Sequence, residues 1–421
     1  MNSIRSIKGT HDILPADSRS WQILESIVRK VCARFGYHEI RTPAFEETRL
    51  FSRSVGEETD IVAKEMYSWE DKDGTSITLR PELTASVVRS FIQHNLGGQA
   101  PLQRLYYMGP LFRRERPQKG RQRQFHQFGV EAFGSENPEQ DAEIIAIAWH
   151  ILDDCGLRKE ATLELNSIGS TKCRIDYQDA LKNFIRPNLD KFSETSRKRF
   201  ETNPLRILDT KAEHEKTLLT GGPVVSDFYT DEDEVHFESL KIFLDSMNIP
   251  FKINSKLVRG LDYYSRTVFE FTSPALGAQD ALLGGGRYDK LVETLGGKST
   301  PGIGFAAGME RFLIAMKNKE QQSEKSNIDV YFVCLDEAGL STALSISNEL
   351  RQDGYSLVAD PLRRSMKAQM REANKSGAKF ALILGATEME TESVILKNLK
   401  DGNQKIIQQN NVKDELRKLT I

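Results

Sequence analysis

The chain has 421 residues, of which 39% are hydrophobic and 28% charged, and its formal net charge is −2. This composition is typical of globular chains with two or three domains, and the nearly neutral charge excludes a uniformly basic nucleic-acid coat. The sequence has no apolar run of membrane-spanning length and no signal-peptide core, and its four cysteines lack Cys-x-x-Cys spacing. These features favour a protein of the reducing cytoplasm, without a membrane anchor or a protein-held transition metal.

The first predicted elements are a helix and a strand. Apolar residues recur with helical spacing over residues 18–35, which predicts an amphipathic helix. A strand is predicted over residues 36–46, although Pro43 lies inside it. Because proline has no N–H to donate to a ladder, we expect this strand at an edge or at an interface.

A predicted hairpin follows, formed by strands at residues 64–70 and 76–80 around a turn that ends in glycine. It leads into a helix that begins near Pro81, where a missing N–H is tolerated. Glu82 and Thr84 then lie in the first turn of this helix, where acidic side chains favour the helix dipole. The simplest interpretation of both residues is that they cap the helix.

The stretch 104–134 predicts two strands joined by a basic loop. Alternation in the second strand places Gln127, Gly129 and Glu131 on one face. Because glycine lacks a side chain, a hollow is predicted between the amide and the carboxylate. Arg113 of the first strand reaches the same hollow if the two strands pair as a hairpin. This face therefore has the features of a pocket floor.

The loop of this hairpin carries five cationic side chains around Pro117 and Gly120, namely Arg114, Arg116, Lys119, Arg121 and Arg123. Such a loop suits phosphate-rich ligands. The alternative is a hairpin with a solvated basic tip, since runs of charge often simply face water.

The middle of the chain predicts a helix at residues 141–152, a strand at 161–166 and a charged, helical insertion at about 170–248. Strand character returns at Phe251 and continues through residues 257–271. The glycine-rich stretches that follow lack the spacing of a dinucleotide-binding fingerprint. Their glycines are expected to permit close packing of backbone against a ligand or a strand.

The C-terminal part begins after a polar segment, residues 317–327, which predicts a linker. Beyond it strands alternate with helices, which is typical of a small, mostly parallel α/β domain. Two interpretations fit the four basic residues near one of these helices: they contact nucleic acid, or they simply face water. They are Arg363, Arg364, Lys367 and Arg371.

Several blocks carry a family resemblance. Residues 257–264 read LVRGLDYY and residues 284–289 read GGGRYD, while 112–115 and 308–312 match two degenerate class II signatures. With these blocks the sequence resembles the histidyl-tRNA synthetases, a family of class II aminoacyl-tRNA synthetases, over nearly its whole length. It departs from the family pattern at two positions, Leu83 and Ala306, where the family often has glycine. Leu83 is expected to narrow the rim of the pocket.

The resemblance implies an α+β protein. It predicts a class II catalytic domain with an antiparallel sheet at residues 1–325, interrupted by the insertion, and an anticodon-binding α/β domain at residues 328–421. It also implies a homodimer joined partly through the Pro43 strand. The implied reaction forms histidyl-adenylate from L-histidine and ATP, and then transfers histidine to tRNA(His).

For the amino acid, the resemblance implies that Glu82, Thr84 and Gln127 hold the α-amino group. It implies that Glu131 and Tyr264 recognise the imidazole. The further residues that it places around histidine are Arg259, Tyr263 and Tyr288.

For the nucleotide, the resemblance places Arg113 at the α-phosphate and Phe125 and Arg311 on the two faces of adenine. It places Glu115 near the exocyclic amine and adds Arg121 to the ATP site. Because a carboxylate must approach a phosphate, cations are needed at the developing charge, and Arg113 and Arg259 are the catalytic candidates. An ion pair with Asp262 is the structural alternative for Arg259.

Magnesium is expected to bridge the outer phosphates of ATP, since phosphate oxygens and water suit it better than a protein cage. No tightly bound cofactor is expected. The candidates for contact with the tRNA acceptor end are Gln118 and Arg123 of the basic loop.

Two other functions fit parts of the pattern. A regulatory paralogue of the same fold binds histidine without charging tRNA, but such proteins usually lack the C-terminal domain and the Arg259 block. A nucleic-acid-binding module without catalysis would use the basic loop, and would leave Gln127 and Glu131 unexplained. Histidine-dependent exchange of pyrophosphate into ATP distinguishes the three.

Overall fold

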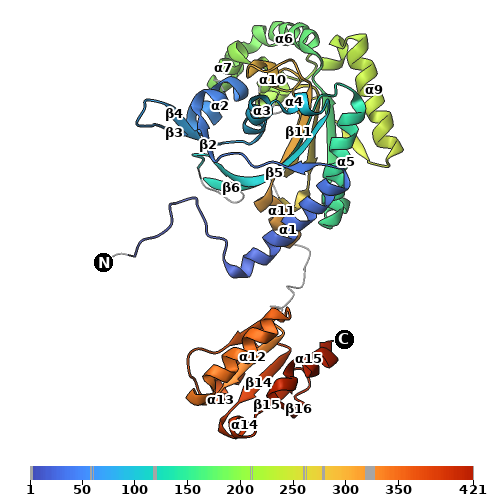
Figure 1. Ribbon diagram of the computed structural model, residues 1–421. Coiled ribbons are helices and arrows are strands. Elements are labelled where there is room, and N and C mark those ends of the chain that lie inside the picture. The colour runs from blue at the N-terminus through green and yellow to red at the C-terminus, as the bar shows by residue number, and fades with distance from the viewer. Residues whose placement is uncertain are drawn as a thin grey trace. The chain divides into compact units, whose positions relative to one another are not determined.

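The computed structural model describes residues 3–56, 59, 61–116, 121–208, 210, 212–258, 261, 263–276, 280–317 and 328–420. The chain divides into two compact units, Met1–Glu320 and Gln321–Ile421 (Figure 1). Within the described ranges, no helix is both long and apolar enough to cross a membrane.

The first unit is built on an eight-stranded sheet with the order β1-β5-β6-β11-β10-β9-β7-β8. The five pairings from β5 to β7 are antiparallel, and only the outermost pairs, β1 with β5 and β7 with β8, are parallel. This confirms the expected antiparallel sheet. Its strands are β1 (His38–Glu39), β5 (Gln103–Phe112), β6 (Gln124–Phe133), β7 (Thr162–Ser167), β8 (Phe251–Ile253), β9 (Ser265–Thr272), β10 (Ala281–Arg287) and β11 (Gly302–Gly308).

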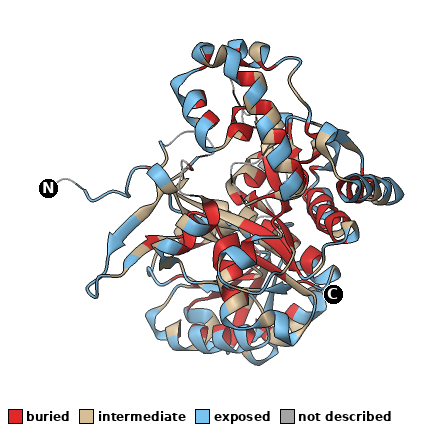
Figure 2. Cartoon of the chain, turned by 90° about the horizontal axis from the view of Figure 1, so that it is seen from above, coloured by how far each residue is buried: buried red, intermediate tan, exposed pale blue. Residues whose placement is uncertain are grey.

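Helices cover the two faces of this sheet differently. On one face, α1 (Pro15–Arg34), α5 (Pro138–Asp154), α9 (Asp231–Ser246) and α11 (Met309–Lys317) share a large core with the sheet, which includes Phe128 and Val130 of β6. Buried and exposed residues alternate along α1 and α9, whereas α5 and α11 are mostly buried. Figure 2 shows the buried residues gathered in the interior and the exposed ones on the outer sides of helices. On the opposite face, α3 (Thr84–Gln93) and α10 (Leu291–Thr294) pack over only part of the sheet. The remaining part of that face is where the cavity described below lies.

The predicted hairpin over residues 104–134 is confirmed. β5 and β6 pair without interruption from Gln103 opposite Phe133 to Phe112 opposite Gln124. As the alternation predicted, Phe128 and Val130 face the helical core. Residues 117–120 at the tip of the predicted basic loop lie outside the described residues.

The single strand predicted over residues 36–46 is wrong. Pro43 lies between β1, which is an edge strand, and β2 (Phe45–Glu47), which belongs to a separate three-stranded sheet of order β2-β4-β3. Proline supplies no N–H for a ladder, and the backbone carbonyls of Thr42 and Pro43 accept hydrogen bonds from the Arg80 side chain instead. The partner strands are β3 (Tyr67–Glu70) and β4 (Ser76–Leu79).

The strand predicted over residues 257–271 is also only partly right, because β9 begins at Ser265. Tyr263 and Tyr264 precede it and line the cavity instead of continuing a ladder. Arg259, Gly260 and Asp262 lie outside the described residues.

Between β7 and β8 the chain is mainly helical, and α6, α7 and α9 lie together at the top of Figure 1. An apolar cluster of its own, including Tyr177, Leu181 and Phe200, holds α6 and α7 together. Asp233, in the first turn of α9, accepts hydrogen bonds from the backbone and hydroxyl of Ser170 at the start of α6. The remaining helices of the unit are α2 (Thr48–Val55), α4 (Leu96–Gln99), α6 (Thr171–Ile185), α7 (Glu194–Thr202) and α8 (Glu213–Leu218).

The second unit has a five-stranded sheet of order β13-β12-β14-β15-β16. Two of its pairings are parallel and two are antiparallel, so the prediction of a mostly parallel sheet is wrong. The sequence prediction missed the last strand and helix, because their segment contains few apolar residues. The strands are β12 (Val330–Cys334), β13 (Leu357–Ala359), β14 (Phe380–Leu384), β15 (Ser393–Asn398) and β16 (Gln404–Gln408), and the helices are α12 (Leu340–Gln352), α13 (Met366–Ser376), α14 (Ala386–Glu390) and α15 (Val412–Thr420).

The basic residues near α13 have different environments. Arg364 binds Asp360 through two nitrogens, at 3.0 and 2.6 Å, and Arg363 forms an ion pair with Glu337. Lys367 and Arg371 are exposed. The exposed pair presents positive charge to the solvent, while Arg364 helps to hold the unit together.

A buried ion pair joins α5 to the end of β10. Arg287 and Asp141 are both fully buried and hydrogen-bonded to each other, and Arg287 also contacts Asp289 at 3.0 Å. Removing one partner of such a pair leaves an uncompensated buried charge, which typically costs about 3–5 kcal/mol. Substituting one residue of the pair therefore tests how much the pair contributes to the free energy of unfolding.

We expect Arg287→Met to lower the free energy of unfolding by roughly 3 kcal/mol or more, measured by urea denaturation. The matched control is Arg34→Met, which removes a half-exposed ion pair with Asp154 and should cost less than about 1 kcal/mol. Equal losses in the two variants would contradict a structural role for the buried pair.

Candidate functional site

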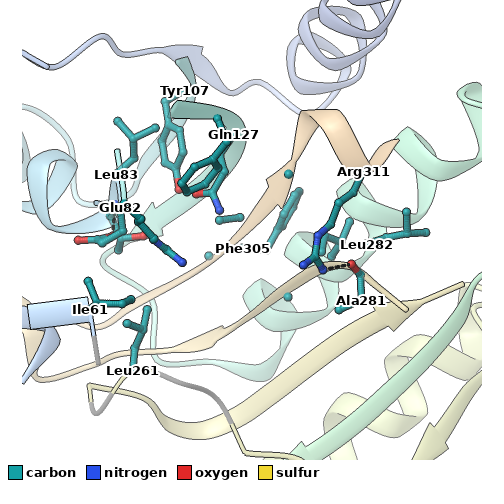
Figure 3. Close-up of a pocket in the computed structure, with 18 of the residues that line it drawn as sticks. Ile61, Glu82, Leu83, Tyr107, Gln127, Leu261, Ala281, Leu282, Phe305 and Arg311 are labelled. Atoms are coloured by element: carbon teal, nitrogen blue, oxygen red, sulfur yellow. Dashed lines mark hydrogen bonds between the residues drawn. The ribbon is translucent and has the colours of Figure 1, made fainter. Parts of the chain in front are cut away.

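A cavity of about 300 Å³ opens on the less covered face of the large sheet. Its walls come from β5, β6, β10 and β11, from the start of α3 and from the segment before β9. Figure 3 shows Glu82, Tyr107 and Gln127 at one end and Arg311 beside Ala281 at the other, with Phe305 between them. The cavity therefore has two ends with different chemistry.

The hollow that the sequence predicted beside Gly129 is not open. Gly129 pairs with Tyr107 across the hairpin, and a Cβ atom on Gly129 would lie 2.2 Å from the Tyr107 hydroxyl oxygen. The glycine is needed because the tyrosine ring lies over it. Tyr107 thus fills the predicted hollow and brings its hydroxyl group to the cavity.

Glu131 is the most enclosed polar group at this end, with 1% of its surface exposed. Its Oε1 accepts hydrogen bonds from the hydroxyls of Thr84, at 2.7 Å, and Tyr107, at 3.2 Å, and its Oε2 accepts one from Tyr288. Burial raises the pKa of Glu131 to about 8, although these hydrogen bonds favour the charged form. An acidic group that changes its charge near neutral pH therefore lies in the floor of the cavity.

Gly304 of β11 provides the room for this carboxyl group. A Cβ atom at Gly304 would lie 1.8 Å from Oε2 of Glu131, so no larger residue fits without displacing the carboxylate. The glycine-rich run therefore permits a close approach between a backbone and a functional side chain, as the sequence suggested.

Glu82 both caps a helix and lines the cavity. Its two carboxylate oxygens accept the backbone N–H groups of Thr84, at 2.7 Å, and Ala85, at 2.8 Å, at the start of α3. The capping interpretation is thus confirmed for Glu82, although α3 begins at Thr84 and Glu82 precedes its first turn. It is wrong for Thr84, whose hydroxyl donates to Glu131 instead. The same carboxylate is 4% exposed and lies among the cavity residues, and burial raises its pKa.

A second part of the cavity wall combines charged residues with an aromatic ring. The Arg113 guanidinium lies 5.2 Å from the centroid of the Phe125 ring and donates from Nε to the backbone oxygen of Pro81 at 2.9 Å. Glu115 lies between Arg113, at 3.9 Å, and Arg121, at 3.3 Å. This part of the wall can therefore hold a flat ring and negative charge together.

Arg311, from the first turns of α11, lines the cavity beside Ala281. Its Nη1 donates to the backbone oxygen of Ala281 at 2.8 Å (Figure 3). Burial lowers its pKa, but an arginine side chain keeps its charge in proteins.

Most of the sequence-predicted site residues line this one cavity. They are Glu82, Thr84, Arg113, Glu115, Arg121, Phe125, Gln127, Glu131, Tyr263, Tyr264, Tyr288 and Arg311. Arg123 does not line it; its backbone pairs with Arg113 and Gly9 at the base of the hairpin loop. Arg259 and Gln118 lie outside the described residues.

Leu83 and Ala306, the two departures from the family pattern, both line the cavity. Leu83 is 2% exposed and belongs to the apolar cluster beneath α3, so most of its side chain packs inward.

The sequence analysis missed several residues that line the cavity, and two of them make polar contacts there. Tyr107 is one, and the available signal was its position opposite a glycine in a predicted hairpin. Glu310 is the other; it lines the cavity, and its carboxylate accepts the backbone N–H of His126 at 2.9 Å. Glu310 is separated from β6 by 184 residues along the chain, so local sequence spacing could not reveal this contact.

The described residues include no group of three or more His, Cys, Asp or Glu side chains that could hold a metal ion. The site is made of hydrogen-bonding and ionic groups.

Comparisons with known proteins agree along the chain. The family model described as histidyl-tRNA synthetase matches residues 9–312, and the model described as anticodon binding domain matches residues 329–419. A histidine–tRNA ligase from Halothermothrix orenii is 45% identical over 417 residues, which are 99% of this chain and 99% of that protein.

Solved structures show the same relationship. The crystal structure of apo histidyl-tRNA synthetase from S. aureus is 36% identical, covers 99% of this chain and 100% of its own, and superposes with a TM-score of 0.84. A histidyl-tRNA synthetase from Nostoc has 21% identity, covers 100% of both chains and has a TM-score of 0.69, which supports the fold alone.

The matched models, the sequence identity and the shared fold lead to one conclusion: this chain belongs to the histidyl-tRNA synthetase family.

Proposed function

We propose that this chain activates L-histidine with ATP to form histidyl-adenylate and pyrophosphate, and then transfers histidine to the 3′ end of tRNA(His). The observation that carries the proposal is the cavity itself. It holds a buried carboxyl group that accepts hydrogen bonds from hydroxyls, an arginine over an aromatic ring, and a second arginine beside Ala281. The family membership adds the substrates to this geometry.

In this proposal, the histidine ring binds Glu131. Oε1 already accepts two hydrogen bonds, whereas Oε2 accepts one, from Tyr288. A carboxylate oxygen has two lone pairs, so Oε2 retains one for an imidazole N–H. The aromatic rings of Tyr263 and Tyr264, whose centroids are 4.8 Å apart, form the adjoining wall.

The α-amino group would bind Glu82, Thr84 and Gln127. Glu82 uses one lone pair on each oxygen for the helix cap, so each oxygen can still accept a hydrogen bond from an ammonium group. The cap thereby fixes the orientation of the carboxylate before the substrate arrives.

The reaction joins two anions. A carboxylate oxygen of histidine attacks the α-phosphorus of ATP, and the bond from this phosphorus to the bridging oxygen breaks as pyrophosphate leaves. Arg113 is proposed to stabilise the developing charge at the α-phosphate, with Arg259, which the structure does not describe, as the second cation. Phe125 and Arg311 would hold the adenine between them, with Glu115 and Arg121 beside it.

ATP is proposed to enter with Mg²⁺ bound to its outer phosphates, since these oxygens and water are ligands that Mg²⁺ prefers. In the second step, a ribose hydroxyl of the tRNA attacks the mixed anhydride and AMP leaves. Gln118 and Arg123 are proposed to contact the acceptor end of the tRNA. The second unit, which matches an anticodon-binding domain, is proposed to contact the anticodon. The cytoplasm is the proposed location of the reaction, which cell fractionation can check.

A homodimer is also proposed, formed in part by the small β2-β4-β3 sheet. Phe45 and Trp69 are 55% and 44% exposed there, and their ring centroids are 6.5 Å apart. A pair of exposed aromatic residues is unusual on a surface that meets only water. Packing against a second copy would bury both.

The central test is ATP–pyrophosphate exchange with each standard amino acid. Histidine alone is expected to drive exchange, because a site that hydrogen-bonds a polar ring leaves its own polar groups unpaired when an apolar analogue binds. Discrimination on the order of 10⁴ is expected. Equal exchange with a second amino acid, or none with histidine, would contradict the proposal; the second result would instead support the regulatory paralogue.

A second test uses the raised pKa of Glu131. A carboxyl group whose pKa is higher in the folded than in the unfolded state contributes stability below its unfolded value and loses it as pH rises towards about 8. Glu131→Gln, which keeps the shape but cannot ionise, should therefore gain stability relative to the unchanged protein between about pH 5 and pH 8. Urea denaturation at several pH values measures the difference.

The same Glu131→Gln variant should lose histidine-dependent exchange while ATP binding remains. A stability difference that does not change with pH would show that Glu131 is ionised in the empty cavity. Full exchange activity in the variant would remove Glu131 from histidine recognition.

The dimer is tested by Phe45→Glu combined with Trp69→Glu. We expect the unchanged protein to behave in sedimentation as twice its chain mass of 47.7 kDa, and the double variant as a single chain. Leu344→Glu, which alters an apolar residue on α12 that is 58% exposed, is the control and should stay dimeric. A dimeric Phe45/Trp69 variant would place the interface elsewhere.

A further inference from the structure

Arg80, at the C-terminal end of β4, joins three separate segments of the first unit. It is 5% exposed, and its Nε donates to the backbone oxygen of Pro110 in β5 at 2.9 Å. Its Nη1 donates to the backbone oxygens of Thr42, at 2.7 Å, and Pro43, at 3.0 Å. One guanidinium group thus connects the segment between β1 and β2 to the last third of β5.

The hydrogen bonds of the Arg80 side chain go to backbone oxygens and to the Thr42 hydroxyl, and none of them goes to a carboxylate. Burying a cation without a carboxylate partner carries a desolvation cost, which these carbonyl groups offset only in part. The planar fork of arginine can donate in two fixed directions at once, which the single ammonium group of lysine cannot do. The hydrogen bonds of Arg80 therefore fix the relative positions of these segments more than they add to the free energy of unfolding.

The backbone around Arg80 leads directly to Arg113. The oxygen of Arg80 accepts the N–H of Phe112 at 3.1 Å, and the oxygen of Pro81 accepts Nε of Arg113 at 2.9 Å. On its other side, the N–H of Arg80 donates to the oxygen of Ala44 at 3.0 Å. Pro81, which follows Arg80 in the chain, thus holds the Arg113 side chain. Phe112, which precedes Arg113, donates its N–H to the backbone oxygen of Arg80.

Gly109 leaves space for this arrangement. A Cβ atom at Gly109 would lie 2.6 Å from Nη2 of Arg80, which is closer than side-chain atoms pack. Since Arg80 is held by several hydrogen bonds, alanine at position 109 would push the guanidinium group out of place. The chain therefore offers two independent ways to disturb the same contact.

We propose that Arg80 is a positioning residue for adenylate formation. It holds the Pro81 oxygen and the end of β5, and these two fix the orientation of the Arg113 side chain. This inference rests on the role of Arg113 in the proposed function. Arg80 does not line the cavity, so it acts through Arg113 and not on a substrate. A displacement of about 1 Å at a catalytic group can cost on the order of 10²-fold in rate.

The test compares Arg80→Met, Arg80→Lys and Gly109→Ala by rapid-quench measurement of the two half-reactions in the full chain. All three should slow adenylate formation, Arg80→Met by on the order of 10- to 100-fold. Transfer of histidine from preformed adenylate to tRNA should change little, and so should the KM for histidine. Gly109→Ala keeps the proposal testable if Arg80→Met does not fold.

The matched control is Arg89→Met. Arg89, on α3, binds Glu46 of β2 at 2.5 and 3.1 Å, so it ties β2 to the same part of the unit without supporting Arg113. This variant should lose some stability and keep the rate of adenylate formation. A loss of rate equal to that of Arg80→Met would mean that any loosening of β2 has this effect, and would overturn the proposal.

A double-mutant cycle separates the inference from the proposed function. Arg113→Ala alone should slow adenylate formation by on the order of 10²-fold or more. In that background, Arg80→Met should cost much less than it does alone, because its effect passes through Arg113. Additive losses would overturn the positioning role, whereas an unchanged rate in Arg113→Ala would refute the role of Arg113 itself.

Discussion

The register between β5 and β6 is the constraint on which the site depends. It places Tyr107 opposite Gly129, so that the tyrosine lies over a residue without a side chain and its hydroxyl reaches Glu131. Since side chains alternate along a strand, a slip of one residue would turn Gln127 and Glu131 into the helical core and bring Phe128 and Val130 into the cavity. Burial of those two apolar side chains against the helices therefore also fixes the position of the polar ones.

The first unit contains buried charges of two kinds. Arg287 and Asp141 neutralise each other in the interior and do not line the cavity, and their role is to hold elements together. Glu131, in contrast, accepts hydrogen bonds from hydroxyl groups, and burial raises its pKa. Burying the Glu131 carboxylate costs folding free energy. We therefore expect a ligand at this place to supply the interaction that the empty cavity lacks.

Unequal covering of the sheet explains where the cavity lies. Four helices fill one face with a continuous apolar core, and on the other face α3 and α10 cover only a part. The sheet brings together strands from distant parts of the chain, so Arg311 of α11 and Phe125 of β6 line the same cavity. An antiparallel sheet suits this arrangement because it can pack a core on one side and leave the other side open.

The sequence alone determined the hairpin, the inward and outward faces of β6, the cap at Glu82 and the family, because each of these follows from local spacing or from a short motif. It could not determine the interruption at Pro43, the filling of the hollow beside Gly129 by Tyr107, or the mixed directions of strands in the second unit. Those features depend on which distant segments pack together. Periodicity along a chain shows which face of a strand is buried, but not which side chain from elsewhere will bury it. Tertiary structure alone brought Glu310 to His126 and Arg80 to Pro110, because hydrogen bonds between backbone and side chains 184 and 30 residues apart leave no trace in local spacing.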